Sequence, residues 1–186
     1  PMKIAVINFS GNVGKSTVAR HLLAPRIPGC QVVAVESINA SDRQPVTIRG
    51  RQFAQLQDYL HTVSDVVVDV GASNVEDLLA LMRRYRGSHE DFDCFVVPTV
   101  PALKQQQDTA ATLAELARIG VQAARLRLVF NQVEDDSPIE QVFETLLAYC
   151  AATGAVKPRI EACMTQNEVY ARVRDTGLSL RELAAD

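Results

Sequence analysis

The sequence predicts an α/β fold, in which a mainly parallel central sheet is covered by helices on both faces within one domain, residues 1–186. Short apolar runs rich in β-branched residues alternate along the chain with segments of helical spacing, the pattern of a buried parallel sheet with crossover helices. The residues with the clearest chemistry, from Ser10 to Ser16 and at Glu36, Asp69 and Asn131, each follow such a run. Because ligands bind beyond the carboxyl ends of parallel strands, we expect these residues to share one site.

Hydrophobic periodicity and the positions of proline and glycine predict the elements in the first half of the chain. Short apolar runs predict strands at 3–7, 31–36 and 65–70. Apolar residues three or four positions apart predict helices at 15–23, 51–62 and 74–84. The polar segment 37–50 contains Pro45 and Gly50, so we expect it to be a loop.

The second half continues the alternation. Strands are expected at 94–97 and 126–130, with a short edge strand at 155–160. A long helix at 104–119 ends at Gly120, and Ser137 followed by Pro138 begins a helix that continues to residue 152. Two short helices at 166–174 and 179–184 complete the prediction.

The composition indicates a soluble globular protein, with 47% hydrophobic and 22% charged residues. The four cysteines are far apart and lack metal-ligand spacing, which favours buried, reduced thiols in a cytoplasmic protein. Pro1 before Met2 is interpreted as a remnant of tag cleavage. No apolar run is long enough to cross a bilayer.

The segment from Lys3 to Thr17 has the order strand, glycine-bearing loop and helix, which is the context of a phosphate-binding loop. Glycines allow backbone N–H groups to face phosphate oxygens, and the helix start adds partial positive charge. Lys15 is expected to reach the β- and γ-phosphates and the Ser16 hydroxyl to bind Mg²⁺. The alternative is a tight turn with an exposed lysine.

The loop departs from the general phosphate-loop template, because Phe9 stands where that template has its first glycine. It resembles instead the deviant Walker A loop of the ParA/MinD superfamily, typically Lys-Gly-Gly-x-Gly-Lys-Thr-Thr. Gly11, Val13, Gly14, Lys15, Ser16 and Thr17 match this pattern, whereas Asn12 replaces a glycine and Ser10 replaces the signature lysine. The resemblance implies a three-layer P-loop NTPase fold that binds ATP or ADP with Mg²⁺ at residues 11–17.

Further roles depend on the same resemblance. Asp69 corresponds to the Walker B acid that holds Mg²⁺ opposite Ser16, although an aspartate there also suits a turn cap. Asn131 corresponds to an asparagine that contacts adenine, with a turn asparagine as the alternative. Glu36 stands where the family has an Asp-x-Asp pair, one member of which orients the attacking water, and the second acid is missing here. Glu36 is thus a candidate to act on water or Mg²⁺, with an ordinary exposed glutamate as the alternative and Asp42 as a reserve candidate.

Ser10 is the departure with the largest expected consequence. The family's lysine at this position reaches the phosphates of a partner subunit in a nucleotide-dependent dimer and stabilises charge as the γ-phosphate leaves. A serine supplies no such charge, so we expect ATP binding with slow hydrolysis, or a cation supplied from elsewhere.

The partners are less well defined by the sequence. Lys157, Arg159, Arg172, Arg174 and Arg181 resemble the basic residues with which ParA-like proteins grip DNA, but acidic residues are interspersed and the net charge is −3. A solvated helix face is therefore the alternative to direct DNA contact. The C-terminal segment is too short and too acidic for a membrane anchor.

Within the superfamily, the loop and the small size are most similar to StbB-type plasmid stability proteins. That similarity implies slow ATP hydrolysis in plasmid partition or conjugative DNA positioning, through a DNA-binding adaptor and a nucleotide-dependent homodimer. Two alternatives remain. One is a nucleotide-gated adaptor that does not hydrolyse ATP, and the other is a dethiobiotin-synthetase-type ligase, for which Lys104 is the candidate extra cation.

Overall fold

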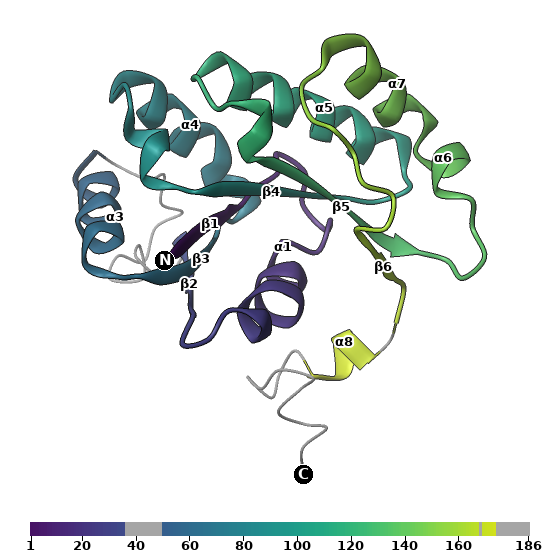
Figure 1. Ribbon diagram of the computed structural model, residues 1–186, viewed down its shortest axis with the longest axis horizontal. Coiled ribbons are helices and arrows are strands. Elements are labelled where there is room, and N and C mark those ends of the chain that lie inside the picture. Colours follow the sequence, from purple (N-terminus) through teal and green to yellow (C-terminus); the bar gives the residue numbers. More distant parts are fainter. Residues whose placement is uncertain (36–49, 168, 174–186) are drawn as a thin grey trace.

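The computed structural model describes residues 1–35, 50–167 and 169–173, with Ala171 and Arg172 as backbone only. Its centre is a sheet in which every pairing is parallel, with the strand order β2-β3-β1-β4-β5-β6 (Figure 1). The strands are β1 Met2–Val6, β2 Gln31–Ala34, β3 Asp65–Asp69, β4 Cys94–Thr99, β5 Leu126–Val133 and β6 Cys163–Thr165. The prediction of a mainly parallel sheet is confirmed.

The helices form two layers of unequal size (Figure 1). One face is covered by α4 Val75–Arg84, α5 Leu103–Arg118 and α7 Glu144–Thr153, with α3 Gly50–Thr62 and the short α6 Ile139–Val142 at its two ends. The other face carries α1 Lys15–Thr17, which continues as a π-helical segment Val18–Leu23, and α8 Val169–Val173. None of the helices in the described part of the chain combines the length and apolar character needed to cross a bilayer.

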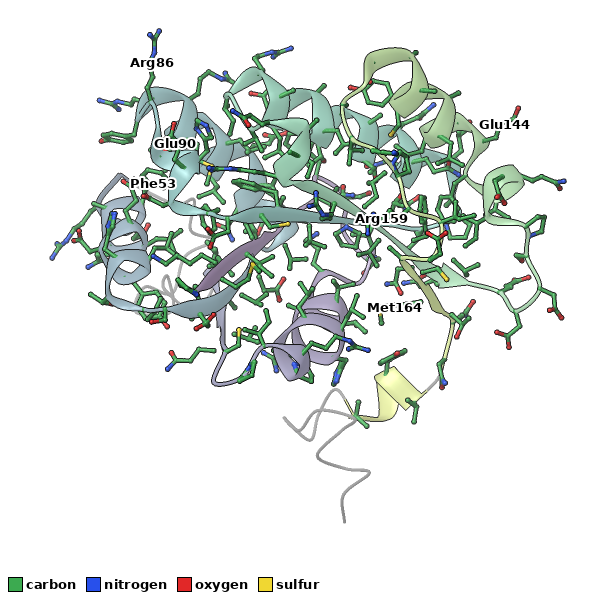
Figure 2. The ribbon with its side chains drawn as sticks, viewed as in Figure 1. Phe53, Arg86, Glu90, Glu144, Arg159 and Met164 are labelled. Carbon is green, nitrogen blue, oxygen red and sulfur yellow. The ribbon has the colours of Figure 1, made fainter. Side chains whose placement is uncertain are left out.

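The central strands β1, β3 and β4 are largely buried on both faces, because their side chains alternate between two cores. Ala5, Ile7 and Phe95 belong to the larger core, together with Phe53, which projects from α3 (Figure 2). Ile4, Val6 and Val67 belong to the smaller core, which also contains Val18 and Met164. The sheet is therefore covered on both sides, as the continuous apolar runs predict.

The strand order determines where the loop after β1 lies. The chain enters the sheet at β1, adds β3 and β2 on one side, and then crosses to β4 on the other. A crevice opens at the carboxyl end of a strand where the chain changes direction in this way. That strand is β1, and the segment from residue 7 to residue 14 follows it directly.

Three predicted elements differ from the structure. The edge strand expected at 155–160 is wrong: β6 forms later, at Cys163–Thr165, because Pro158 interrupts the earlier segment and the first bond to β5 runs from Phe130 N–H to Ala162 O. The single helix expected at 137–152 is divided at Phe143, whose backbone leaves helical geometry (φ −108°, ψ 24°) and whose ring packs on Phe130 in the core. The fifth strand extends to Val133, so Asn131 lies within it.

Candidate functional site

The loop between β1 and α1 turns by placing two residues in the left-handed region of backbone space. Asn12 has φ 58° and Gly14 has φ 82°. A Cβ atom built on Gly14 would lie 2.1 Å from the amide nitrogen of Asn131. Only glycine fits this position, for both its φ angle and its contact.

Lys15 is folded back into the loop. Its side chain is buried, and its ammonium donates hydrogen bonds to the carbonyl oxygens of Ser10 at 2.6 Å and Asn8 at 3.2 Å. The loop thus curls around a positive charge at the start of a helix, which is the electrostatic requirement for binding an anion.

Ser16 and Asp69 meet across the site. Asp69 is the last residue of β3, opposite Val6 of β1 in the parallel register. The Ser16 hydroxyl donates to its carboxylate at 2.5 Å. A hydroxyl and a carboxylate oxygen are ligands that Mg²⁺ prefers, so this pair fits the metal that the loop implies.

Asn131 is engaged with the loop itself. Its side chain is buried, and its amide nitrogen donates to the carbonyl oxygen of Val13 at 2.9 Å. The neighbouring Gln132 donates to the carbonyl oxygen of Asn12 at 3.2 Å. The adenine contact expected of Asn131 stays a prediction; the bond to Val13 leaves the amide oxygen and one N–H of the amide for it.

A groove of about 1040 Å³ runs from the loop along α1 to β2 and α8. The residues at its loop end are Gly11, Asn12, Gly14, Lys15, Ser16, Thr17 and Asp69. At its other end, the rings of His21 and Tyr170 lie 5.7 Å apart at a tilt of 46°. Burial and the charge of Arg20 lower the pKa of His21. The sequence did not single out this ring pair, because residues 21 and 170 meet only once α8 packs beside α1.

Helix α5 holds the first part of the loop, which the sequence also did not predict. The Asn8 amide donates to Pro98 O and Thr109 Oγ1, both at 2.8 Å, and the Phe9 N–H donates to Thr112 Oγ1 at 3.1 Å. The buried Ser10 hydroxyl donates to Asp108 at 2.8 Å. Hydrogen bonds from Lys104 and Ser10 lower the pKa of Asp108. The sequence feature that could have indicated these contacts is the row of polar residues along α5, whose other side is apolar.

Several predicted residues are not placed. Glu36 and Asp42 lie outside the described residues, as do Arg174 and Arg181. Arg172 belongs to α8, but only its backbone is described. Arg159 is exposed in the connection between α7 and β6 (Figure 2). The structure therefore brings together residues 11–17, Asp69 and Asn131. The acid predicted to orient water and most of the predicted basic group are not described.

Neither a protein-family model nor a curated protein matches the sequence. Solved structures do. Apo McdA of Cyanothece superposes with a TM-score of 0.63 at 13% identity, covering 98% of this chain and 93% of that one. MinD of Aquifex aeolicus has a TM-score of 0.64 at 10% identity, with coverage of 96% and 88%. A plasmid partition protein of Borrelia burgdorferi bound to AMPPNP has a TM-score of 0.57 at 11% identity, with coverage of 91% and 88%. At these identities the likeness establishes the fold, which is that of the ParA/MinD ATPases.

Proposed function

We propose that this protein is a ParA/MinD-type ATPase that binds ATP with Mg²⁺, hydrolyses it slowly, and acts in positioning or partition of a cargo. The observation that carries the proposal is the convergence of Lys15, Ser16 and Asp69 on one left-handed turn at Gly14. Three chemical requirements of a magnesium triphosphate are met there: amides at a helix start, a buried ammonium, and a hydroxyl beside a carboxylate. The shared fold adds support, since solved structures with this fold include ATPases.

Each residue has a defined task in this proposal. The backbone between Gly11 and Ser16 would hold the phosphates, and Lys15 would move from the loop carbonyls to the phosphate oxygens. Ser16 and Asp69 would hold Mg²⁺, which neutralises charge on the phosphates when it is bound. The open space above Gly11, where a Cβ would meet nothing within 4 Å, leaves room at the entrance to the loop.

The proposed slow turnover follows from Ser10. Its hydroxyl is already bonded to Asp108, and it brings no positive charge to the site. Loss of a cation that stabilises the leaving phosphoryl group costs orders of magnitude in turnover in related reactions. In this proposal the cargo is plasmid DNA, reached through a DNA-binding adaptor as in StbB-type proteins.

Isothermal titration calorimetry of wild type and Lys15→Ala with Mg²⁺-ATP tests nucleotide binding. We expect heat with wild type and none with Lys15→Ala, because that change removes the buried ammonium. The control is Lys157→Ala, which removes an exposed lysine outside the groove. If no heat is detected with wild type, the proposal of nucleotide binding is wrong and only the description of the fold remains.

Turnover and assembly are tested separately. We expect low ATPase activity that DNA together with the adaptor increases, and a larger elution volume with ADP than with a non-hydrolysable ATP analogue in size-exclusion chromatography. Wild type that stays monomeric with every nucleotide would contradict a ParA-like cycle.

One alternative is favoured by a specific observation. Because the Ser10 hydroxyl is bonded to Asp108, the protein suits a nucleotide-gated adaptor that binds ATP without hydrolysing it. Tight ATP binding with no phosphate release, with or without DNA, would favour the adaptor. The ligase alternative is weaker, because among the described residues near the loop Lys104 is its one candidate cation, and such an enzyme needs a substrate pocket with further cationic residues.

A further inference from the structure

A chain of three side chains connects solvent to the phosphate loop. The ammonium of Lys104, on the first turn of α5, lies 2.8 Å from the carboxylate of Asp108. The same carboxylate oxygen accepts the hydroxyl of Ser10 at 2.8 Å. The exposed fractions of the two charged side chains are 77% for Lys104 and 29% for Asp108, whereas Ser10 is buried at 4%. The lysine is thus held at the loop by a carboxylate that is itself bonded to the loop.

The hydrogen-bonded series from Lys104 through Asp108 ends at Ser10, where the terminal phosphate is expected. The carbonyl oxygen of Ser10 accepts the hydrogen bond of Lys15, the residue that reaches the β- and γ-phosphates in such loops. The next residue, Gly11, lines the groove. Because both hydrogen bonds to Asp108 are 2.8 Å long, the Lys104 ammonium lies within twice 2.8 Å of the Ser10 hydroxyl.

The stability of α5 gives little reason for a lysine at this position. A positive charge in the first turn opposes the helix dipole. A lysine that precedes its acid by four residues is the less favourable order for an ion pair on a helix. Exposed pairs of this kind contribute little to stability. The position therefore disfavours a purely structural role for the Lys104 charge.

The chemistry of the pair suits a mobile cation. Lys104 and Ser10 both hold the pKa of Asp108 below its ordinary value, so the carboxylate stays ionised and keeps the lysine near the loop. An ammonium has three N–H donors, and the bond to Asp108 uses one of them. Its four-carbon stem is flexible, and the remaining N–H donors can bind an anion beside the loop.

We propose that Lys104, held beside Ser10 by Asp108, binds the terminal phosphate of a nucleoside triphosphate in the same chain. This inference rests on the proposed nucleotide function and assigns a cation to the site that Ser10 leaves without one. Lys104 then makes the site prefer a triphosphate over a diphosphate.

The experiment is calorimetry with ADP and with AMPPNP, each with Mg²⁺, on wild type, Lys104→Ala, Lys104→Arg and Arg118→Ala. Arg118→Ala is the matched control, because it removes an exposed, ion-paired cation from the opposite end of the same helix. We expect Lys104→Ala to weaken AMPPNP binding about tenfold, as for loss of one charge-assisted hydrogen bond, and to leave ADP affinity unchanged. Lys104→Arg should retain most of the preference.

The outcomes separate this inference from the function on which it rests. If wild type binds neither nucleotide, the proposed function fails and the inference fails with it. If wild type binds both and Lys104→Ala keeps the same ratio of affinities, only the inference is overturned. It is also overturned if Arg118→Ala lowers the ratio equally, or if Lys104→Arg behaves like Lys104→Ala, because a specifically placed charge would then not be the cause.

Discussion

Gly14 is the residue on which the geometry of the loop between β1 and α1 depends most directly. Its φ of 82° is unfavourable for any side chain by about 1–2 kcal/mol, and its Cβ position is taken by the amide of Asn131. We expect Gly14→Ala to lower the free energy of unfolding by more than about 2 kcal/mol and to abolish nucleotide binding. Urea unfolding and calorimetry measure the two effects.

The matched control is Gly29→Ala. Gly29 also has a positive φ, 71°, but a Cβ there would meet nothing within 4 Å. Gly29→Ala should lower the free energy of unfolding only through backbone strain at positive φ, by about 1–2 kcal/mol, and nucleotide binding should be retained. Equal losses for the two variants would show that the contact with Asn131 contributes nothing.

Asp108 is the residue for which the structure predicts a pH dependence. In the folded protein, hydrogen bonds from Lys104 and Ser10 lower the pKa of Asp108 from its ordinary value of 3.8. A carboxyl whose pKa is lower in the folded than in the unfolded protein stabilises the folded state. This contribution is fully present at pH values above the pKa of the unfolded state, and it is lost as the pH falls through the pKa of the folded state. We therefore expect wild type to be more stable than Asp108→Asn at pH 7 and 5, with the difference shrinking below about pH 3.8.

Urea unfolding of both proteins across this pH range measures the difference. Its size should be modest, because the pair is near the surface and screened by solvent. Asp135→Asn, at an exposed aspartate in a turn, serves as the control and should have little effect at any pH. A difference that grows on acidification would contradict the assignment.

Helix α5 is the element that joins the loop to the rest of the fold, and Gln106 joins the same helix to α6 and α7. The buried Gln106 amide donates to Pro101 O at 2.7 Å and Val142 O at 2.9 Å, and its oxygen accepts the N–H of Leu146 at 3.3 Å. Val142 and Leu146 flank Phe143, where the helix is interrupted between α6 and α7. The side chain thus satisfies backbone groups that a continuous helix would have bonded internally.

We expect Gln106→Leu to destabilise the protein by about 2–4 kcal/mol, because buried backbone groups lose their partners. The adjacent Gln107 is exposed, and Gln107→Leu should change stability by no more than about 0.5 kcal/mol. Thermal and urea unfolding of the two variants make the comparison. Similar stabilities would mean that water replaces the glutamine at no cost.

At the scale of the whole molecule, the site joins both halves of the sheet. The loop follows β1, Asp69 ends β3, and Asn131 lies in β5, so the proposed ligand would contact strands on both sides of β1. A ligand that binds only the folded state at 100 times its dissociation constant stabilises it by about 2.7 kcal/mol. For a chain of this length, that corresponds to a rise in Tm of about 5–10 °C.

A thermal melt with Mg²⁺-ATP measures this linkage. Wild type should show the rise and Lys15→Ala should show none, because the variant lacks the buried ammonium. A rise of the same size in Lys15→Ala would indicate that the nucleotide binds elsewhere.

The sequence by itself determined the alternation of strands and helices and the location of the glycine-bearing loop between β1 and α1. Both are encoded locally: strand runs, helical spacing, Gly120 after α5 and the Gly14-Lys15-Ser16 segment are all visible within a few residues. It also placed Asp69 and Asn131 near the loop, because the carboxyl ends of parallel strands share one edge of the sheet.

The tertiary structure alone decided which side chains hold that loop. Ser10 and Asp108 are 98 positions apart, and Asn131 and Val13 are 118 apart. Such contacts depend on strand order and on the rotation of α5, which periodicity does not encode. For the same reason, the sequence did not distinguish Gln106 from its neighbours. It also did not show that β6 would pair at Cys163 rather than in the segment before it, because strand pairing and packing depend on the partners that the fold supplies.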